Sequence, residues 1–133
     1  MISDMTVKEL GFDSQVCTTL EQSQRLLALG LKPETADMAH IAFGGGGMMT
    51  RPYDWLCTTK VEINNFYPAW SLHRLIGMCN KTQYGMTISI YNDEVTVDGD
   101  LFEVLDNTYD NLISVIEWLI KGGHFKKEYL KID

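Results

Sequence analysis

The sequence predicts a single α+β domain, in which a small antiparallel sheet of three to five strands carries two main helices packed on one face. Three patterns support this prediction. Segments 18–30 and 109–120 have the apolar spacing of helices, whereas residues 84–91 alternate between apolar and polar. The length of 133 residues fits one domain over 1–133, with residues 1–16 as a loosely packed N-terminal arm.

The first predicted helix begins at a capping box and ends at a glycine. Thr18 and Glu21 have the spacing at which a cap hydroxyl and a carboxylate satisfy two free amides of the first turn. Gly30 follows the leucines, and a glycine in this place adopts the left-handed conformation without steric cost. Residues 33–38 should then form a single helical turn.

Two further helices are predicted downstream. The second begins near Pro68, because proline is tolerated in a first turn whose amide has no partner. Its expected buried side consists of Trp70, Leu72, Leu75, Ile76 and Cys79. The third begins at a Thr108 cap and stops at Gly122-Gly123. Its apolar residues recur at i, i+3, i+4 and i+7: Tyr109, Leu112, Ile113, Ile116, Leu119 and Ile120.

The strands are predicted from alternation, from β-branched and aromatic content, and from turn residues. Asn92-Asp93 and Asp98-Gly99 are turn signals between short apolar segments, so a meander is expected there. Two upstream segments should pair across a glycine-rich loop. The expected strands are 41–43, 55–63, 84–91, 94–97 and 101–104.

The charge is acidic and unevenly distributed. Eleven Lys and Arg against 18 Asp and Glu leave a net charge of -7, and no basic cluster is present to bind nucleic acid. We therefore expect no direct binding to nucleic acid or to an anionic membrane. No apolar run approaches the roughly 20 residues that a bilayer span requires.

The acidic residues of segment 93–117 are the first candidate binding surface. This acidic face would engage a basic protein, since complementary charge speeds encounter and selects partners. A solvated hairpin and an adventitious calcium site are the alternatives, although the residue order of an EF-hand is absent. The candidate residues are Asp93, Glu94, Asp98, Asp100 and Glu103.

An aromatic stretch is the second candidate binding surface. Trp55, Tyr67 and Trp70 lie before and at the start of the second helix, and Arg74 follows them on it. Aromatic residues beside an arginine are typical of interface hot spots. Packing of the same aromatic residues in the core is the alternative.

No motif predicts a catalytic, metal or cofactor site. Gly44–Gly47 lacks the lysine and hydroxyl of a phosphate-binding loop, and the histidines and cysteines form no close ligand pairs. A nucleophile would need Cys17, Cys57 or Cys79 to meet His40 or His73 in space, without any local motif to indicate it. An odd number of cysteines with no CxxC pair, and no secretory signal at the first five residues, favours reduced thiols in a cytoplasmic protein.

Four segments in a fixed order also resemble a known group of proteins. They are Cys17–Ser23, Leu29–Met38, Pro68–Leu72 and Tyr109–Leu112. Their order is similar to that in short proteins encoded in gut Bacteroidetes genomes, commonly in phage-like or mobile-element regions. That group has no established activity, so the resemblance implies a kind of gene and no mechanism, and it does not extend to the Gly44–Gly47 loop.

The functional expectation is a non-enzymatic interaction or regulatory module. Its partner would be another protein, or a second copy of this chain paired at a sheet edge. The alternative is a small-ligand-binding protein or minor enzyme with a pocket near Trp70, His73 and the glycine loop. A partly apolar cavity with convergent polar groups would favour the alternative.

Overall fold

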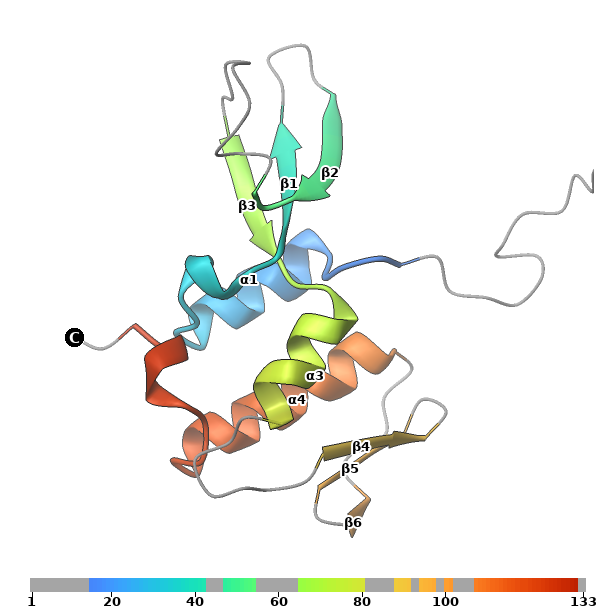
Figure 1. Cartoon of the computed structure of the whole chain (residues 1–133), viewed down its shortest axis with the longest axis vertical. Helices are drawn as coiled ribbons and strands as arrows, with labels where there is room; N and C mark the ends of the chain where they lie inside the picture. Colours follow the sequence, from blue (N-terminus) through green and yellow to red (C-terminus); the bar gives the residue numbers. More distant parts are fainter. Residues whose placement is uncertain are drawn as a thin grey trace, which may run out of the picture.

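The helices of the protein form a central layer. The computed structural model describes residues 15–42, 47–54, 65–80, 88–91, 94–97, 100–101 and 107–131. Its helices are α1 (Leu20–Ala28), α3 (Leu72–Asn80) and α4 (Thr108–Lys121), with short 3-10 turns η1 (Pro33–Thr35) and η2 (Lys127–Tyr129). Helices α3 and α4 pack against each other, and α1 contacts both α4 and the first sheet (Figure 1).

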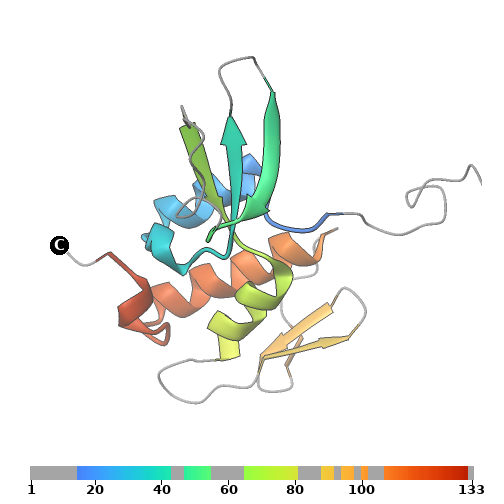
Figure 2. The same cartoon turned by 45° about the horizontal axis from the view of Figure 1, so that its top comes forward.

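The strands form two antiparallel sheets on either side of these helices (Figures 1 and 2). The first sheet has the order β2-β1-β3, and the second has the order β4-β5-β6. The strands are β1 (Met38–Ala42), β2 (Met48–Pro52), β3 (Asn65–Ala69), β4 (Ile88–Tyr91), β5 (Glu94–Val97) and β6 (Asp100–Leu101).

The predicted α+β class is confirmed, and so is the meander expected around the two turn signals, where β4, β5 and β6 pair in order. The upstream strands form a separate sheet instead of joining that meander in one sheet. Helix α3 follows β3 after a connection of two residues, Trp70 and Ser71, and leads away from the first sheet toward the second (Figure 2). The two sets of strands therefore cannot pair with each other. Within the second sheet, β4 and β5 pair as expected, whereas residues 43, 55–63, 84–87 and 102–104 of the predicted strands lie outside the described residues.

The predicted caps of two helices are each off by one residue. Thr19 caps α1: its hydroxyl accepts from the Gln22 amide at 3.2 Å, and the Gln22 side chain accepts from the Thr19 amide at 3.0 Å. Asn107 caps α4 in place of the predicted Thr108, and accepts from the Tyr109 amide at 2.8 Å. In both cases the cap is the last residue with extended backbone. The predicted glycine after α1 is confirmed, since Gly30 has a φ of 103°.

Pro68 belongs to a strand and does not open the second helix. It lies in β3 opposite Ala39, at one edge of the first sheet, where a missing amide donor costs little. The helix instead begins at Leu72, and the Ser71 hydroxyl accepts from the Arg74 amide at 3.1 Å as its cap. Trp70 therefore lies in the connection between β3 and α3.

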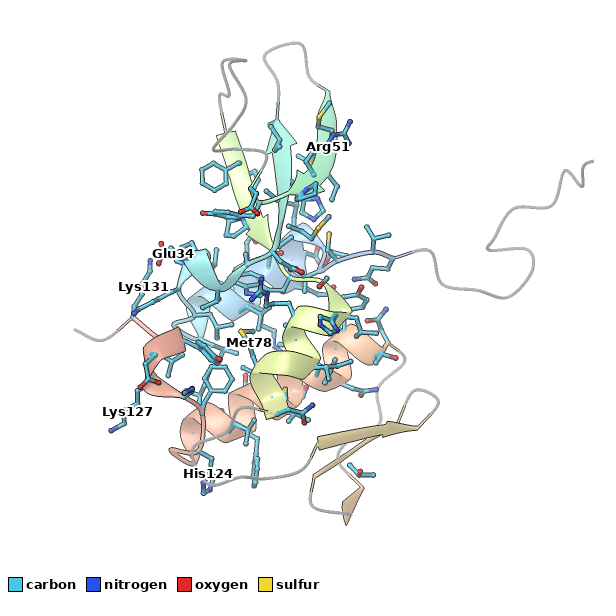
Figure 3. All side chains as sticks on the ribbon, in the orientation of Figure 1. Glu34, Arg51, Met78, His124, Lys127 and Lys131 are labelled. Carbon is cyan, nitrogen blue, oxygen red and sulfur yellow. The ribbon has the colours of Figure 1, made fainter. Side chains whose placement is uncertain are left out.

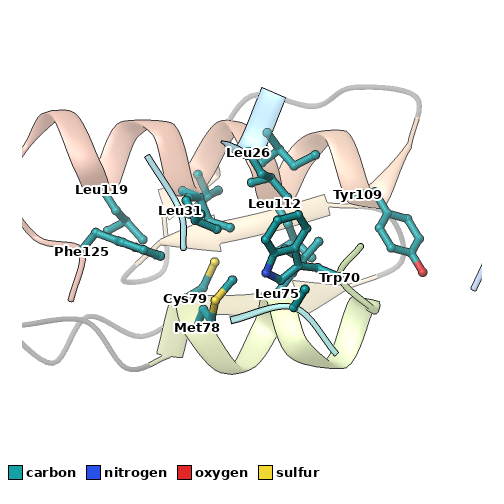
Figure 4. Close-up of a cluster of buried hydrophobic side chains, with 14 residues drawn as sticks. Leu26, Leu31, Trp70, Leu75, Met78, Cys79, Tyr109, Leu112, Leu119 and Phe125 are labelled. Carbon is teal, nitrogen blue, oxygen red and sulfur yellow. The ribbon is translucent and has the colours of Figure 1, made fainter. Parts of the chain in front are cut away.

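The core lies between α3, α4 and the connections around them (Figure 4). Most of the predicted stripe of α4 is confirmed as buried, with Ile120 only partly covered. Among the described residues, the largest fully buried side chain is Trp70, with an exposed fraction of 0%. Other residues of this core are Leu26, Leu31, Leu75, Met78, Cys79, Leu112, Ile113, Ile116, Leu119 and Phe125.

Candidate functional site

A groove opens on the outer side of α3. It has a volume of about 440 Å³. Its walls are η1 with the two residues after it, helix α3, and η2. Figure 3 shows Glu34 and Met78 on two of these elements. The lining residues are Glu34, Thr35, Asp37, His73, Arg74, Gly77, Met78 and Tyr129. Three segments that are distant in the sequence thus build one concavity.

Trp70 holds the η1 wall of the groove in place. Its indole Nε1 donates to Thr35 Oγ1 at 3.0 Å, and the same hydroxyl donates to the Lys32 carbonyl at 2.7 Å. The Trp70 ring is fully buried, so this bond ties the groove wall directly to the core. A buried indole usually finds such a partner, because its N–H would otherwise lose a hydrogen bond to water.

Asp37 connects the η1 side of the groove to the start of α3. One carboxylate oxygen accepts from the Ser71 amide at 2.8 Å, and the other accepts from the Ser71 hydroxyl. A carboxylate in this position is stabilised by the positive end of the helix dipole. The Asp37 carboxylate therefore occupies the N-terminus of α3, and its hydrogen bonds to Ser71 engage it within the protein.

Three other polar side chains of the groove remain free. Glu34, His73 and Arg74 are exposed, and within the described part of the chain none of their side chains makes an ion pair or hydrogen bond. They come from two walls, Glu34 from η1 and the other two from α3. These groups can therefore bind a molecule in the groove without breaking an existing contact.

Gly77 leaves open space in the α3 wall. A Cβ built at this position would meet no atom within 4 Å. Glycine in a helix interior is less favourable than alanine by about 1 kcal/mol. No close packing in the described structure requires glycine here. Its effect is to widen the groove above Met78, which is buried.

The structure also brings one cysteine and one histidine together, away from the groove. Cys17 Sγ lies 3.8 Å from His40 Nε2, which is the kind of pair that a nucleophilic mechanism would require. The same Nε2 lies 2.8 Å from the Thr18 carbonyl oxygen, and Nδ1 lies 2.9 Å from Thr50 Oγ1. A carbonyl can only accept, so Nε2 carries a proton and has no lone pair for the thiol.

The environment of the thiol also opposes nucleophilic chemistry. Burial raises the pKa of Cys17 to about 11, and the charge of Asp37 adds to the rise. Burial likewise raises the pKa of Cys79 to about 12. Because folding favours the neutral thiols, their contribution to stability is present below about pH 9. It is lost as the pH rises through about 11 for Cys17 and about 12 for Cys79. Both thiols are structural at neutral pH.

We expect Cys17 and Cys79 to be unreactive in the folded protein. At pH 8, about one thiol in a thousand is ionised when its pKa is three units higher. In a Cys57→Ser background, labelling with Ellman's reagent at pH 8 should be far slower in the folded protein than in urea, and should accelerate with rising pH. Equal rates with and without urea at pH 8 would contradict this assignment.

The predicted aromatic stretch is divided by the structure. Trp70 is buried in the core, Tyr67 is half-buried on β3, and Arg74 is exposed on the groove. Trp55 lies outside the described residues. Arg74 therefore lines the groove, whereas Trp70 lies in the core and supports the η1 wall through Thr35.

The predicted acidic face falls mostly outside the described residues. Glu94 and Asp100 lie at the starts of β5 and β6, opposite Tyr91 and Val97 respectively. The other three, Asp93, Asp98 and Glu103, are outside the described residues, as are Gly44–Gly46. The acidic face stays a prediction.

Sequence reasoning found His73 and Arg74 but missed the rest of the groove. Glu34, Asp37 and Tyr129 are far from α3 in the sequence, and only the fold brings them to it. The one local signal was Gly77, an unfavourable residue inside an otherwise regular helical pattern.

The described residues contain neither a metal-binding cluster nor a membrane-spanning helix. No group of three or more His, Cys, Asp or Glu in these ranges is placed to hold a metal ion. No helix in them is long and apolar enough to cross a membrane.

Comparison with known proteins identifies no relative. No protein-family model matches the chain, no curated protein is significantly similar to it, and no solved structure matches its fold. The resemblance to short gut Bacteroidetes proteins therefore stays a prediction.

Proposed function

We propose that this protein binds a small molecule in the groove beside α3. The observation that carries the proposal is a concavity of about 440 Å³ that combines unengaged polar groups with the Met78 and Tyr129 side chains. Small-molecule sites commonly measure about 300–1,000 Å³ and combine apolar walls with a few convergent polar groups. The proposal is for binding alone, since the Cys17–His40 pair does not line the groove.

The interaction-module hypothesis receives less support from the described residues. The exposed large apolar side chains do not gather on one surface. Met48 and Phe66 occupy adjacent register positions of the first sheet and so point to opposite faces. Val16 precedes α1, and Trp118 lies on α4. Isolated exposed apolar residues are normal on protein surfaces. A protein partner for the acidic face stays a prediction.

Substitutions at Gly77 test the proposal. Gly77→Leu should place a side chain in the groove and abolish ligand binding, while Gly77→Ala should leave binding intact. Both should keep or raise stability, since either residue is a better helix former than glycine by up to about 1 kcal/mol. Amide chemical shifts of Thr35, Gly77 and Tyr129, recorded by NMR with a library of small amines, carboxylates and amino acids, provide the measurement.

The result separates occupancy of the groove from damage to the fold. We expect at least one compound to shift these amides in the wild type and in Gly77→Ala, with no shift in Gly77→Leu at unchanged thermal stability. The proposal is wrong if no compound shifts them, or if the leucine variant responds like the wild type.

A further inference from the structure

The free charges of the groove are of both signs. Asp37 is already paired with Ser71, which leaves the Glu34 carboxylate and the Arg74 guanidinium without partners among the described residues. The two residues belong to different walls, η1 and α3. Each charge lies at the end of a long rotatable side chain, so the two can converge on one bound molecule.

This arrangement discriminates between classes of ligand. A simple anion would attract Arg74 but would meet the Glu34 and Asp37 carboxylates in the same groove. A simple cation would pair with Glu34 and face the Arg74 guanidinium. An uncharged molecule would gain no attraction from either charge, because both side chains are exposed to water. A ligand that carries both signs can pair with Glu34 and Arg74 at the same time.

Two of the other lining residues, Met78 and Tyr129, favour an apolar substituent on that ligand. Met78 supplies a thioether, which adapts to irregular apolar shapes, and Tyr129 supplies a ring. Gly77 leaves space between the charged and apolar ends of the α3 wall. The Tyr129 ring is itself supported by Phe125, with ring centroids 5.8 Å apart.

We propose that the groove binds a small zwitterion with an apolar substituent, the chemistry of an α-amino acid. Its carboxylate pairs with Arg74, its ammonium pairs with Glu34, and its side chain lies against Met78 and Tyr129. This inference rests on the proposed small-ligand function. Exposed ion pairs are individually weak, so the dissociation constant should be on the order of 1 mM.

Three matched compounds test the ligand class by NMR titration. L-Phenylalanine carries both charges, phenethylamine lacks the carboxylate, and 3-phenylpropanoate lacks the ammonium group. L-Phenylalanine should bind at least about threefold more tightly than either half-ligand, which is the ratio expected for one exposed ion pair.

Two charge-removing variants then assign each end of the ligand. Arg74→Gln should weaken L-phenylalanine and 3-phenylpropanoate but not phenethylamine, and Glu34→Gln should weaken L-phenylalanine and phenethylamine but not 3-phenylpropanoate. Arg51→Gln and Glu21→Gln are matched controls, since both residues are exposed and neither lines the groove. These controls should bind all three compounds like the wild type.

The outcomes distinguish this inference from the proposed function. If the half-ligands bind as tightly as L-phenylalanine, or if library compounds shift the groove amides while L-phenylalanine does not, the zwitterion inference is wrong and the groove remains a ligand site. If no compound of either set shifts these amides, both the inference and the proposed function are wrong.

Discussion

Replacement of Trp70 by alanine is expected to lower the free energy of unfolding by about 3–5 kcal/mol, the range measured for large aromatic side chains removed from cores. Trp70 is fully buried among the residues of α3 and α4, and its indole N–H donates to Thr35. The substitution therefore opens a cavity and removes the donor that holds the η1 wall. Urea unfolding followed by circular dichroism measures the loss as a lower midpoint.

Trp118 provides a matched control of the same chemistry. Its exposed fraction is 41%, and its ring contacts His124 at the surface end of α4. Trp118→Ala should cost clearly less than Trp70→Ala, because a large part of the Trp118 side chain is already exposed to water in the folded protein. Equal losses at the two positions would show that Trp70 does not anchor the core.

Replacement of Thr18 by valine is expected to cost about 2–3 kcal/mol, although valine has nearly the same shape. Thr18 and Trp70 pair reciprocally: the Thr18 amide donates to the Trp70 carbonyl at 2.9 Å, and the Trp70 amide donates to Thr18 Oγ1 at 3.0 Å. The hydroxyl also shares a hydrogen bond of 2.7 Å with Ser23 Oγ. Valine would leave a buried amide donor without an acceptor, which is the costly form of a lost hydrogen bond.

Ser23→Ala measures the contribution of the Thr18–Ser23 hydrogen bond alone to the free energy of unfolding. It removes the Ser23 hydroxyl but leaves Thr18 Oγ1 to accept from the Trp70 amide. We expect a loss of about 1 kcal/mol, clearly below that of Thr18→Val. The role assigned to Thr18 is incorrect if the two variants unfold at the same urea concentration.

The sequence identified the helices well because their signals are local. The stripe of α4 and the glycine after α1 depend on residues within a few turns of each other, and both agree with the structure. The pairing of β4 with β5 was likewise indicated by a short alternating pattern around a turn. Each of these signals belongs to one element and needs no distant partner.

The sequence could not decide between neighbouring residues whose roles depend on tertiary contacts. Thr18 and Thr19 both fit a helix cap, but only Thr18 meets the Trp70 amide in the core, so Thr19 caps the helix. Pro68 fits a helix start as well as a strand at a sheet edge, and its pairing opposite Ala39 decides for the strand. A local pattern contains no information on which of two such contacts is available.

By itself, the sequence therefore determined the α+β class, the position of α4, the stop of α1 and the β4–β5 pairing, because hydrophobic periodicity and turn chemistry act over short distances. Tertiary structure alone decided that the strands form two sheets, and that Glu34, Arg74 and Tyr129 line one groove. The physical reason is that burying Trp70 between α3 and α4 also fixes η1 through Thr35. The candidate site is thus a product of core packing between distant segments.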